Sequence, residues 1–226
     1  MTRRVFRQAV ALLSGALVLA ACGDDPDPPT RAELAASTVG IVATGCSLVA
    51  ELGSGIVVES AGQVVTAAHT INGASEIAVV DADGTEHAAM VVAFEKDSDL
   101  TVLDAPTLRA EPLSVGEVTL GPATLLVWSR DGSIDRKGVE VVKTLRITIE
   151  DIYAEEIVQR TGMEIAGHIE IGDSGGAVVA EDGDVIGIVY ASSKERDDVG
   201  FATDSAEIRA VLADRSSTPV PNGRCV

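Results

Sequence analysis

"GDSGGAVVAEDGDVIGIV" occupies residues 172–189 and holds one serine among glycines, followed by two short apolar runs that an Asp-Gly pair separates. Apolar runs of this length, rich in β-branched residues, are typical of strands, and Asp182-Gly183 is a common hairpin turn. The stretch therefore predicts a β-hairpin directly after a tight, glycine-rich loop. Ser174 lies on that loop, either as a nucleophile held on a turn or as an ordinary residue between two strands.

Similar short apolar runs, bounded by Gly, Asp or Ser, continue along the chain from about residue 37 to 205. No sustained helical period occurs before residue 150, and strands at this regular spacing favour a sandwich or barrel. We expect an all-β fold in two halves of about six strands, divided near residues 105–117. The segment 205–214 predicts a short C-terminal helix with a serine cap and an apolar face made of Ile208, Val211 and Leu212.

The N-terminal segment has a basic start, an apolar run and small residues before a cysteine, which predicts a signal peptide over residues 1–21. Leu19 to Cys22 are similar to a bacterial lipobox, in which the cysteine is acylated and becomes the new N-terminus; the alternative is a plain signal peptide with a chance cysteine. Residues 22–36 are acidic and proline-rich, so we expect a disordered tether before a folded domain over 37–226. Together these features predict a bacterial envelope lipoprotein.

The net charge is −18 and becomes −21 if the three arginines of the signal segment are removed. Such an acidic chain should avoid nucleic acid and anionic membrane surfaces. Aromatic residues make up only 3% of the chain, so the core must be built from Val, Ile, Leu and Ala. Cys46 and Cys225 are the remaining cysteines, and an exported protein can hold them as a disulfide or as two free thiols.

Ser174 needs a base to take its proton, and the chain has three histidines, all of which precede it: His69, His87 and His168. This order excludes the α/β-hydrolase arrangement, in which the histidine follows the serine. The subtilisin order fails too, because the aspartates before His69 all lie in the predicted tether. The order His, Asp, Ser remains.

His69 directly follows an apolar strand and precedes a turn, where its side chain can face a cleft. His87 follows a hairpin and is expected to be a solvated strand residue. Asp99 stands immediately before an apolar alternation and is the better orienting carboxylate, since Asp97 is flanked by Lys96 and a serine.

Successive backbone N–H groups must converge on one point to stabilise an oxyanion. Gly172 permits the necessary conformation, and Gly175 and Gly176 permit close approach of a substrate. We therefore expect the N–H groups of Gly172 and Ser174 to form an oxyanion hole.

At these residues the sequence resembles the trypsin/chymotrypsin-like serine proteases, in their bacterial envelope branch. The matching stretches are "GSGIVVESAGQVVTAAHTI" (53–71), "DSDLTVL" (97–103) and "GDSGGAVVAEDGDVIGIV" (172–189). The chain looks like an HtrA/Deg-like catalytic domain without a PDZ domain, and still more like the membrane-anchored periplasmic acid-resistance proteases.

The resemblance implies two six-stranded antiparallel β-barrels, over about 37–105 and 117–205, with a helix and tail over 205–226. It implies a triad of His69 as base, Asp99 as orienting group and Ser174 as nucleophile. It also implies a Cys46–Cys225 disulfide, substrate pairing along 188–192, and no cofactor or metal ion. The primary specificity pocket would be formed by His168, Ile169, Val189, Ala191 and Ala202, and a small or medium apolar side chain is expected there.

Two alternatives follow from departures from the family pattern. No activation-site sequence of the digestive type precedes the first strand, so Asp173 must find another partner or belong to a switchable loop, which makes latency an open hypothesis. We expect an envelope serine endopeptidase acting on proteins or peptides, with a non-enzymatic lipoprotein that uses the protease fold as a binding module as the alternative.

Overall fold

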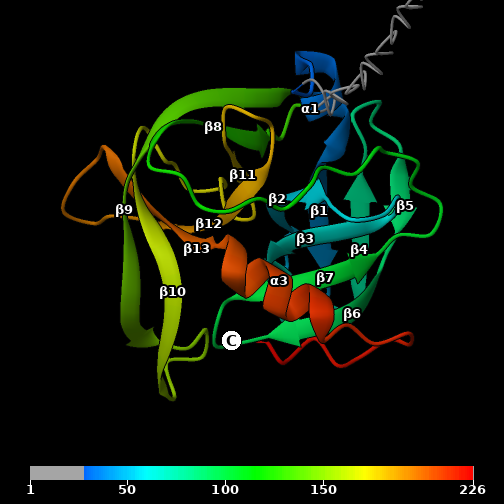
Figure 1. Ribbon diagram of the computed structural model, residues 1–226. Coiled ribbons are helices and arrows are strands. Elements are labelled where there is room, and N and C mark those ends of the chain that lie inside the picture. Colours follow the sequence, from blue (N-terminus) through cyan, green and yellow to red (C-terminus); the bar gives the residue numbers. More distant parts are fainter. Residues whose placement is uncertain (1–27, 226) are drawn as a thin grey trace, which may run out of the picture.

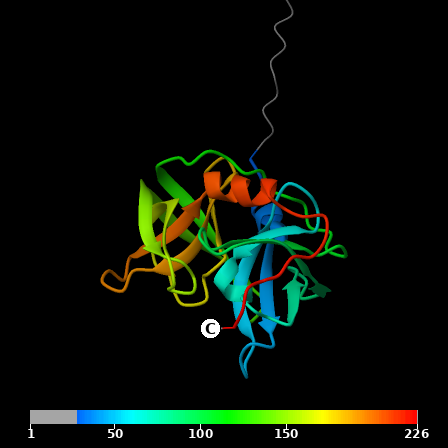
Figure 2. The ribbon, with the colours of Figure 1, turned by 90° about the horizontal axis from the view of Figure 1, so that it is seen from below.

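Val- and Ile-rich runs form two β units that lie side by side in the computed structural model, which describes residues 28–225 (Figure 1). Helix α3 (Ser205–Ala213) packs against strands of both units and crosses the boundary between them (Figures 1 and 2). The expected all-β class, the two-unit arrangement and the short C-terminal helix are confirmed.

The first unit is a seven-stranded sheet in the order β5-β4-β1-β2-β3-β7-β6, where a six-stranded barrel was expected. The additional strand arises because the run 86–95 changes partner after Ala89: residues 86–88 pair with β4, and the Ala89 N–H extends that pairing to the Ile77 carbonyl, whereas residues 90–95 pair with β7. The strands are β1 (Thr38–Thr44), β2 (Glu51–Val57), β3 (Gln63–Ala67), β4 (Glu76–Val80), β5 (Glu86–Ala88), β6 (Met90–Glu95) and β7 (Leu100–Asp104).

The second unit is a closed six-stranded barrel in the order β10-β13-β12-β11-β8-β9. Its strands β9 and β10 form a long hairpin that extends away from the first unit (Figure 1). The strands are β8 (Gly121–Trp128), β9 (Ile134–Glu150), β10 (Ile157–Ala166), β11 (Ala177–Val179), β12 (Val185–Ser192) and β13 (Val199–Asp204).

A shared apolar cluster joins the two units. Ile56 of β2 and Ile188 of β12 belong to it, together with Ile208, Val211 and Leu212, which form the buried face of α3 as predicted. The helix begins with Asp204 as its cap, not with a serine, because the Asp204 carboxylate accepts the N–H groups of Ala206 and Glu207. The cluster ties the units together so that loops from both can line one site.

Part of the predicted tether is folded, so the expected disorder over 22–36 is wrong for its last residues. Helix α1 (Arg31–Ser37) begins with a capping box in which Thr30 and Glu33 exchange side-chain and backbone bonds. Leu34 is then buried in the shared cluster. A helix of about two turns was enough to bury this one apolar side chain, which the surrounding polar composition concealed.

The predicted signal peptide and Cys22 lie outside the described residues. Among residues 28–225, no helix has the length and apolarity needed to cross a membrane.

Candidate active site

His69 and Asp99 form a double hydrogen-bonded pair. His69 lies on α2 (Ala68–Ile71), directly after β3, and Asp99 immediately precedes β7, which pairs with β3. The Nδ1 atom of His69 lies 2.8 Å from Asp99 Oδ2, and the His69 backbone N–H donates to Oδ1 at 2.9 Å. The Asp99 side chain is 6% exposed and that of His69 is 38% exposed, so the carboxylate is buried behind an imidazole that reaches solvent.

The backbone of Asp99 explains how one carboxylate reaches both groups. Its φ of 57° lies in the left-handed region, which Asp tolerates better than most residues. The Asp99 carbonyl also accepts the N–H of Ala68 at 3.1 Å. Three hydrogen bonds thus join Asp99 to two consecutive residues of the other segment and fix the imidazole's orientation and tautomer.

Two opposing effects act on the imidazole. Burial lowers the pKa of His69, but the negative charge and hydrogen bond of Asp99 outweigh burial and raise that pKa above its usual value. Arg160 lowers the pKa of His69 and Glu51 raises it, both by smaller amounts.

The loop that carries Ser174 is a tight turn over Glu170 to Asp173. The Asp173 N–H donates to the Glu170 carbonyl, and Gly172 has a φ of 105°, which is the glycine position of a type II turn. The Ser174 carbonyl then accepts the N–H of Ser54 from β2 at 2.9 Å. The serine loop of the second unit is therefore attached directly to the first.

Gly175 is required where the two units meet. Its φ is 81°, and a Cβ there would lie 2.0 Å from the Ser54 carbonyl oxygen and 2.4 Å from Thr66 Oγ1. The Gly175 N–H donates to the Val189 carbonyl of β12. The glycine thus allows the backbone behind Ser174 to approach both units.

Three N–H groups of this loop, those of Ile171, Gly172 and Ser174, have no acceptor among residues 28–225. Asp173, Gly175 and Gly176 all donate their N–H groups to carbonyls. No hydrogen bond joins Ser174 Oγ to His69 within this part of the chain either, but both side chains line one cavity of about 640 Å³.

Asp173 is buried and has a lysine as its partner. The Lys137 ammonium, from β9, lies 2.8 Å and 3.0 Å from the two Asp173 carboxylate oxygens and 2.9 Å from Glu170 Oε2. The Glu170 N–H also donates to Asp173 Oδ2. Burial lowers the pKa of Lys137, but its bonds to Asp173 and Glu170 outweigh this effect and raise it. The ammonium thus joins both ends of the Gly172 turn.

A smaller cavity of about 170 Å³ adjoins Ser174. Three of the five side chains predicted for a specificity pocket line it: Ile169, Val189 and Ala191. The other two do not. Ala202 is fully buried in the barrel core because it faces inward on β13, and His168 extends into solvent, where its Nε2 lies 3.1 Å from Glu170 Oε1.

Three side chains of the site were not predicted from the sequence, although one of them, Tyr190, lies within the stretch 188–192 that was expected to pair with substrate. Tyr190 lines the small cavity beside Ser174, and the Arg160 guanidinium stacks over its ring at 3.9 Å from the centroid. Lys137 is the third. Each comes from a strand whose pattern predicts only alternation, and only the barrel's closure brings these strands to Ser174.

The segment before Asp99 is also held by a cluster of charges. The Lys96 ammonium contacts Asp97, Asp151 and Glu156 at 2.8, 3.0 and 2.7 Å. The pKa of Asp151 is lowered to about 2. The backbone N–H of Glu155 makes the largest contribution, and the Lys96 ammonium adds to it. This cluster fastens the β6–β7 connection to the β9–β10 hairpin.

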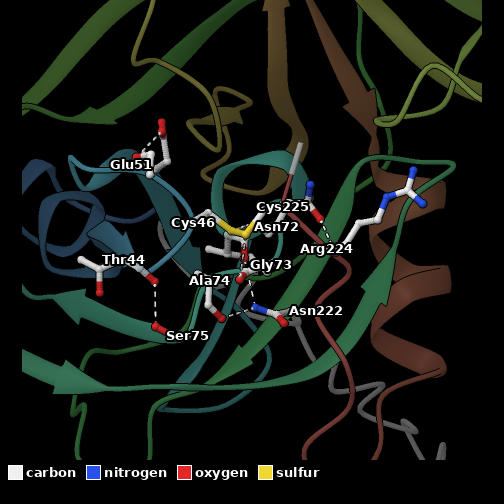
Figure 3. Close-up of a disulfide and its surroundings, with 12 residues drawn as sticks. Thr44, Cys46, Glu51, Asn72, Gly73, Ala74, Ser75, Asn222, Arg224 and Cys225 are labelled. Carbon is white, nitrogen blue, oxygen red and sulfur yellow. Dashed lines mark hydrogen bonds between the residues drawn. A yellow bond between two sulfur atoms is a disulfide. The ribbon is translucent and has the colours of Figure 1, made fainter.

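The C-terminal tail and the disulfide hold the segment after His69 (Figure 3). Cys46 and Cys225 are joined, as the resemblance implied. The Gly73 N–H donates to the Asn222 carbonyl, and the Asn222 side-chain amide donates to the carbonyls of Ile71 and Ala74 at 3.1 and 2.8 Å. The end of α2 is thus fixed from the far end of the chain.

A sequence model of the trypsin-like peptidase domain matches residues 53–188, which include the His69, Asp99 and Ser174 segments. The chain belongs to the trypsin-like peptidase family. This trypsin-like peptidase is 30% identical over 213 residues to serine protease Rv3671c of Mycobacterium tuberculosis, covering 89% of this chain and 53% of the relative. It is 32% identical over 158 residues to the chloroplastic Protease Do-like 1 of Arabidopsis thaliana, covering 66% and 36%.

The fold agrees with this family. The crystal structure of the active form of Rv3671c protease from M. tuberculosis is similar with a TM-score of 0.80 at 25% identity, over 97% of this peptidase and 100% of that chain. The chain spans about half the length of the first curated relative it matches.

Proposed function

We propose that this trypsin-like peptidase is an envelope-anchored serine endopeptidase that cleaves proteins or peptides through His69, Asp99 and Ser174. The observation that carries the proposal is the pair of hydrogen bonds between Asp99 and His69, beside a cavity that both His69 and Ser174 line. A buried carboxylate that fixes Nδ1 leaves Nε2 free to act as base.

In this mechanism Ser174 Oγ attacks the scissile carbonyl carbon while His69 Nε2 takes the hydroxyl proton. The oxyanion accepts hydrogen bonds from the N–H groups of Gly172 and Ser174, whose lack of other acceptors in the described chain supports this role. His69 then gives its proton to the leaving amine as the C–N bond breaks. Water, activated by the same imidazole, hydrolyses the acyl-enzyme and regenerates Ser174.

We place the substrate chain along the end of β12. The three-residue strand β11 pairs with β12 as far as Ile188, so the edge at 190–192 is not covered by β11. A substrate strand paired there would set its side chain into the small cavity, whose Ile169, Val189 and Ala191 walls favour an apolar group. Glu170 also lines this cavity, but Lys137 and His168 hold its carboxylate.

Active-site labelling tests the nucleophile directly. A fluorophosphonate probe should label the native protein and the Ser192→Ala variant, which alters the other serine of the small cavity, but not Ser174→Ala. Labelling that persists in Ser174→Ala would refute the assignment. A folded native protein that is never labelled would favour the binding-module alternative.

The envelope anchor rests on the lipobox that ends at Cys22. A lipid on this cysteine would hold the peptidase at a membrane through the tether that precedes α1. Cys22→Ser should move the protein from the membrane fraction to the soluble fraction in a bacterial host and remove the mass of the acyl chains. An unchanged distribution and mass would exclude the anchor.

A further inference from the structure

Arg160 on β10 is a buried cation with little to compensate it. The residue is 5% exposed and pairs with no carboxylate among residues 28–225. One long hydrogen bond reaches the Asp97 carbonyl at 3.4 Å, and the guanidinium Nε has no hydrogen-bond partner in the described part of the chain. Burying an unpaired charge is costly, so a fold that retains one requires a reason beyond stability.

The guanidinium also stacks over the ring of Tyr190, with its central carbon 3.9 Å from the ring centroid. Tyr190 is the extra residue of a β-bulge, because Val189 pairs with Ala202 and the next paired residue, Ala191, pairs with Phe201. A bulge turns a side chain out of the normal alternation. Tyr190 thereby lines the small cavity beside Ser174 while its ring meets Arg160.

The Arg160 guanidinium lies at the carbonyl of Asp97, two residues before Asp99, so its positive charge also acts on the imidazole that Asp99 holds. Asp99 and Glu51 raise the pKa of His69, whereas Arg160 lowers it. These three residues come from different elements: the segment before β7, strand β2 and strand β10. Other charged side chains line the large cavity with His69, namely Arg130, Asp135, Lys137, Glu170 and Asp173.

We propose that Arg160 is a positioning residue of the proposed active site, which holds the Tyr190 ring beside Ser174 and supplies a fixed positive charge that favours the neutral, basic form of His69. This inference rests on the proposed function for its consequence in cleavage. Its electrostatic part can be measured on the imidazole itself, with or without cleavage.

The charge is tested with Arg160→Gln in a Ser174→Ala background, by NMR titration of the His69 ring. Loss of the positive charge should move the His69 titration midpoint to higher pH by about 0.5 to 1. The ring resonances of His87, which bonds to Asp81 and Thr107 in the first unit, serve as an internal control for the fold and should be unchanged between the two proteins at a fixed pH. An unchanged His69 midpoint would overturn the electrostatic role, even for a protein that cleaves nothing.

The stacking is tested with Arg160→Lys, which retains the charge but lacks the planar guanidinium. In peptide cleavage we expect KM of Arg160→Lys to rise at least about threefold, while the pH at which its activity falls on the acid side stays unchanged. In Arg160→Gln, KM should rise and that pH should also move upward. The control is Arg146→Gln, an equal change of charge on the exposed face of the neighbouring strand β9, which should alter neither readout. An Arg160→Lys protein with native KM would overturn the positioning of Tyr190.

Discussion

The Lys137 ammonium lies 2.8 Å from Oδ2 of Asp173, the residue next to the proposed nucleophile, and both side chains are largely buried. The serine loop thereby has a cation of its own, supplied by the middle of the chain. Because Asp173 and Glu170 hold the two ends of the Gly172 turn, the same ammonium holds that turn in shape.

Removing the cation should loosen the turn. Lys137→Met leaves the Asp173 carboxylate buried and unpaired, which typically costs about 3–5 kcal/mol unless the loop rearranges. We expect kcat/KM to fall about tenfold to a hundredfold as the loop opens to hydrate the carboxylate. Lys143→Met on the same strand is the control, since Lys143 is half exposed and its buried partner Glu164 keeps a second cation, Arg196, at 3.1 Å. Equal activity of both variants would contradict the role of Lys137.

The pH dependence follows from the direction of the shift at His69. Its pKa in the folded protein is raised above 6.5 because Asp99 outweighs burial, and the base must be neutral. Activity should therefore fall as the pH drops through a value above 6.5. Stability has the opposite sign: the His69–Asp99 pair contributes fully below pH 6.5 and its contribution is lost as the pH rises through the folded pKa.

A pH–rate profile of peptide cleavage measures this limb. Asp99→Asn removes the raising effect and the correct tautomer, so kcat should fall about 10³- to 10⁴-fold and the limb should move to lower pH. A maximum of cleavage below pH 5 would contradict the assigned role of the imidazole.

Two glycines of the serine loop should respond differently to alanine. Both have positive φ, but a Cβ at Gly172 would meet no atom of residues 28–225 within 4 Å, whereas one at Gly175 would lie 2.0 Å from the Ser54 carbonyl oxygen. Gly172→Ala should cost about 1–2 kcal/mol of conformational strain and keep the fold. Gly175→Ala should cost more, because the backbone between the two units must move. Urea unfolding of both variants measures this, and equal losses would refute the steric argument.

The disulfide should contribute a large part of the free energy of unfolding, because it restricts the unfolded chain. Cys46 and Cys225 are 179 residues apart, and closing a loop of that length contributes about 5 kcal/mol in the chain-entropy model. The Cys46→Ser/Cys225→Ser variant should lose a similar amount in urea unfolding. The native protein with excess thiol reductant is the matched control and should show the same midpoint. A variant as stable as the oxidised protein would show that the tail's hydrogen bonds alone hold it.

Local sequence determined which residues could form the site. The order of His69, Asp99 and Ser174 excluded two other triad arrangements, and the glycines at 172 and 175 indicated a turn that other residues cannot adopt. Both features can be recognised in the sequence because each depends on the residue type itself: the chemistry of His, Asp and Ser in one case, and the backbone freedom of glycine in the other. The strands and the buried face of α3 were predictable for a similar reason, since burial imposes a period on the chain.

The tertiary structure alone decided what surrounds those residues. Lys137 and Arg160 occupy ordinary positions in strands, where a lysine or arginine normally points to solvent, and Tyr190 is the extra residue of a bulge that the sequence did not reveal. Closing the barrel brings β9, β10 and β12 to the serine loop and makes these side chains its partners. In the closed barrel the Ala202 side chain faces the core and the His168 side chain extends into solvent, so neither lines the pocket predicted for them. The identity of a nucleophile depends on its own chemistry, whereas its counterions and pocket walls depend on contacts between segments that no local pattern encodes.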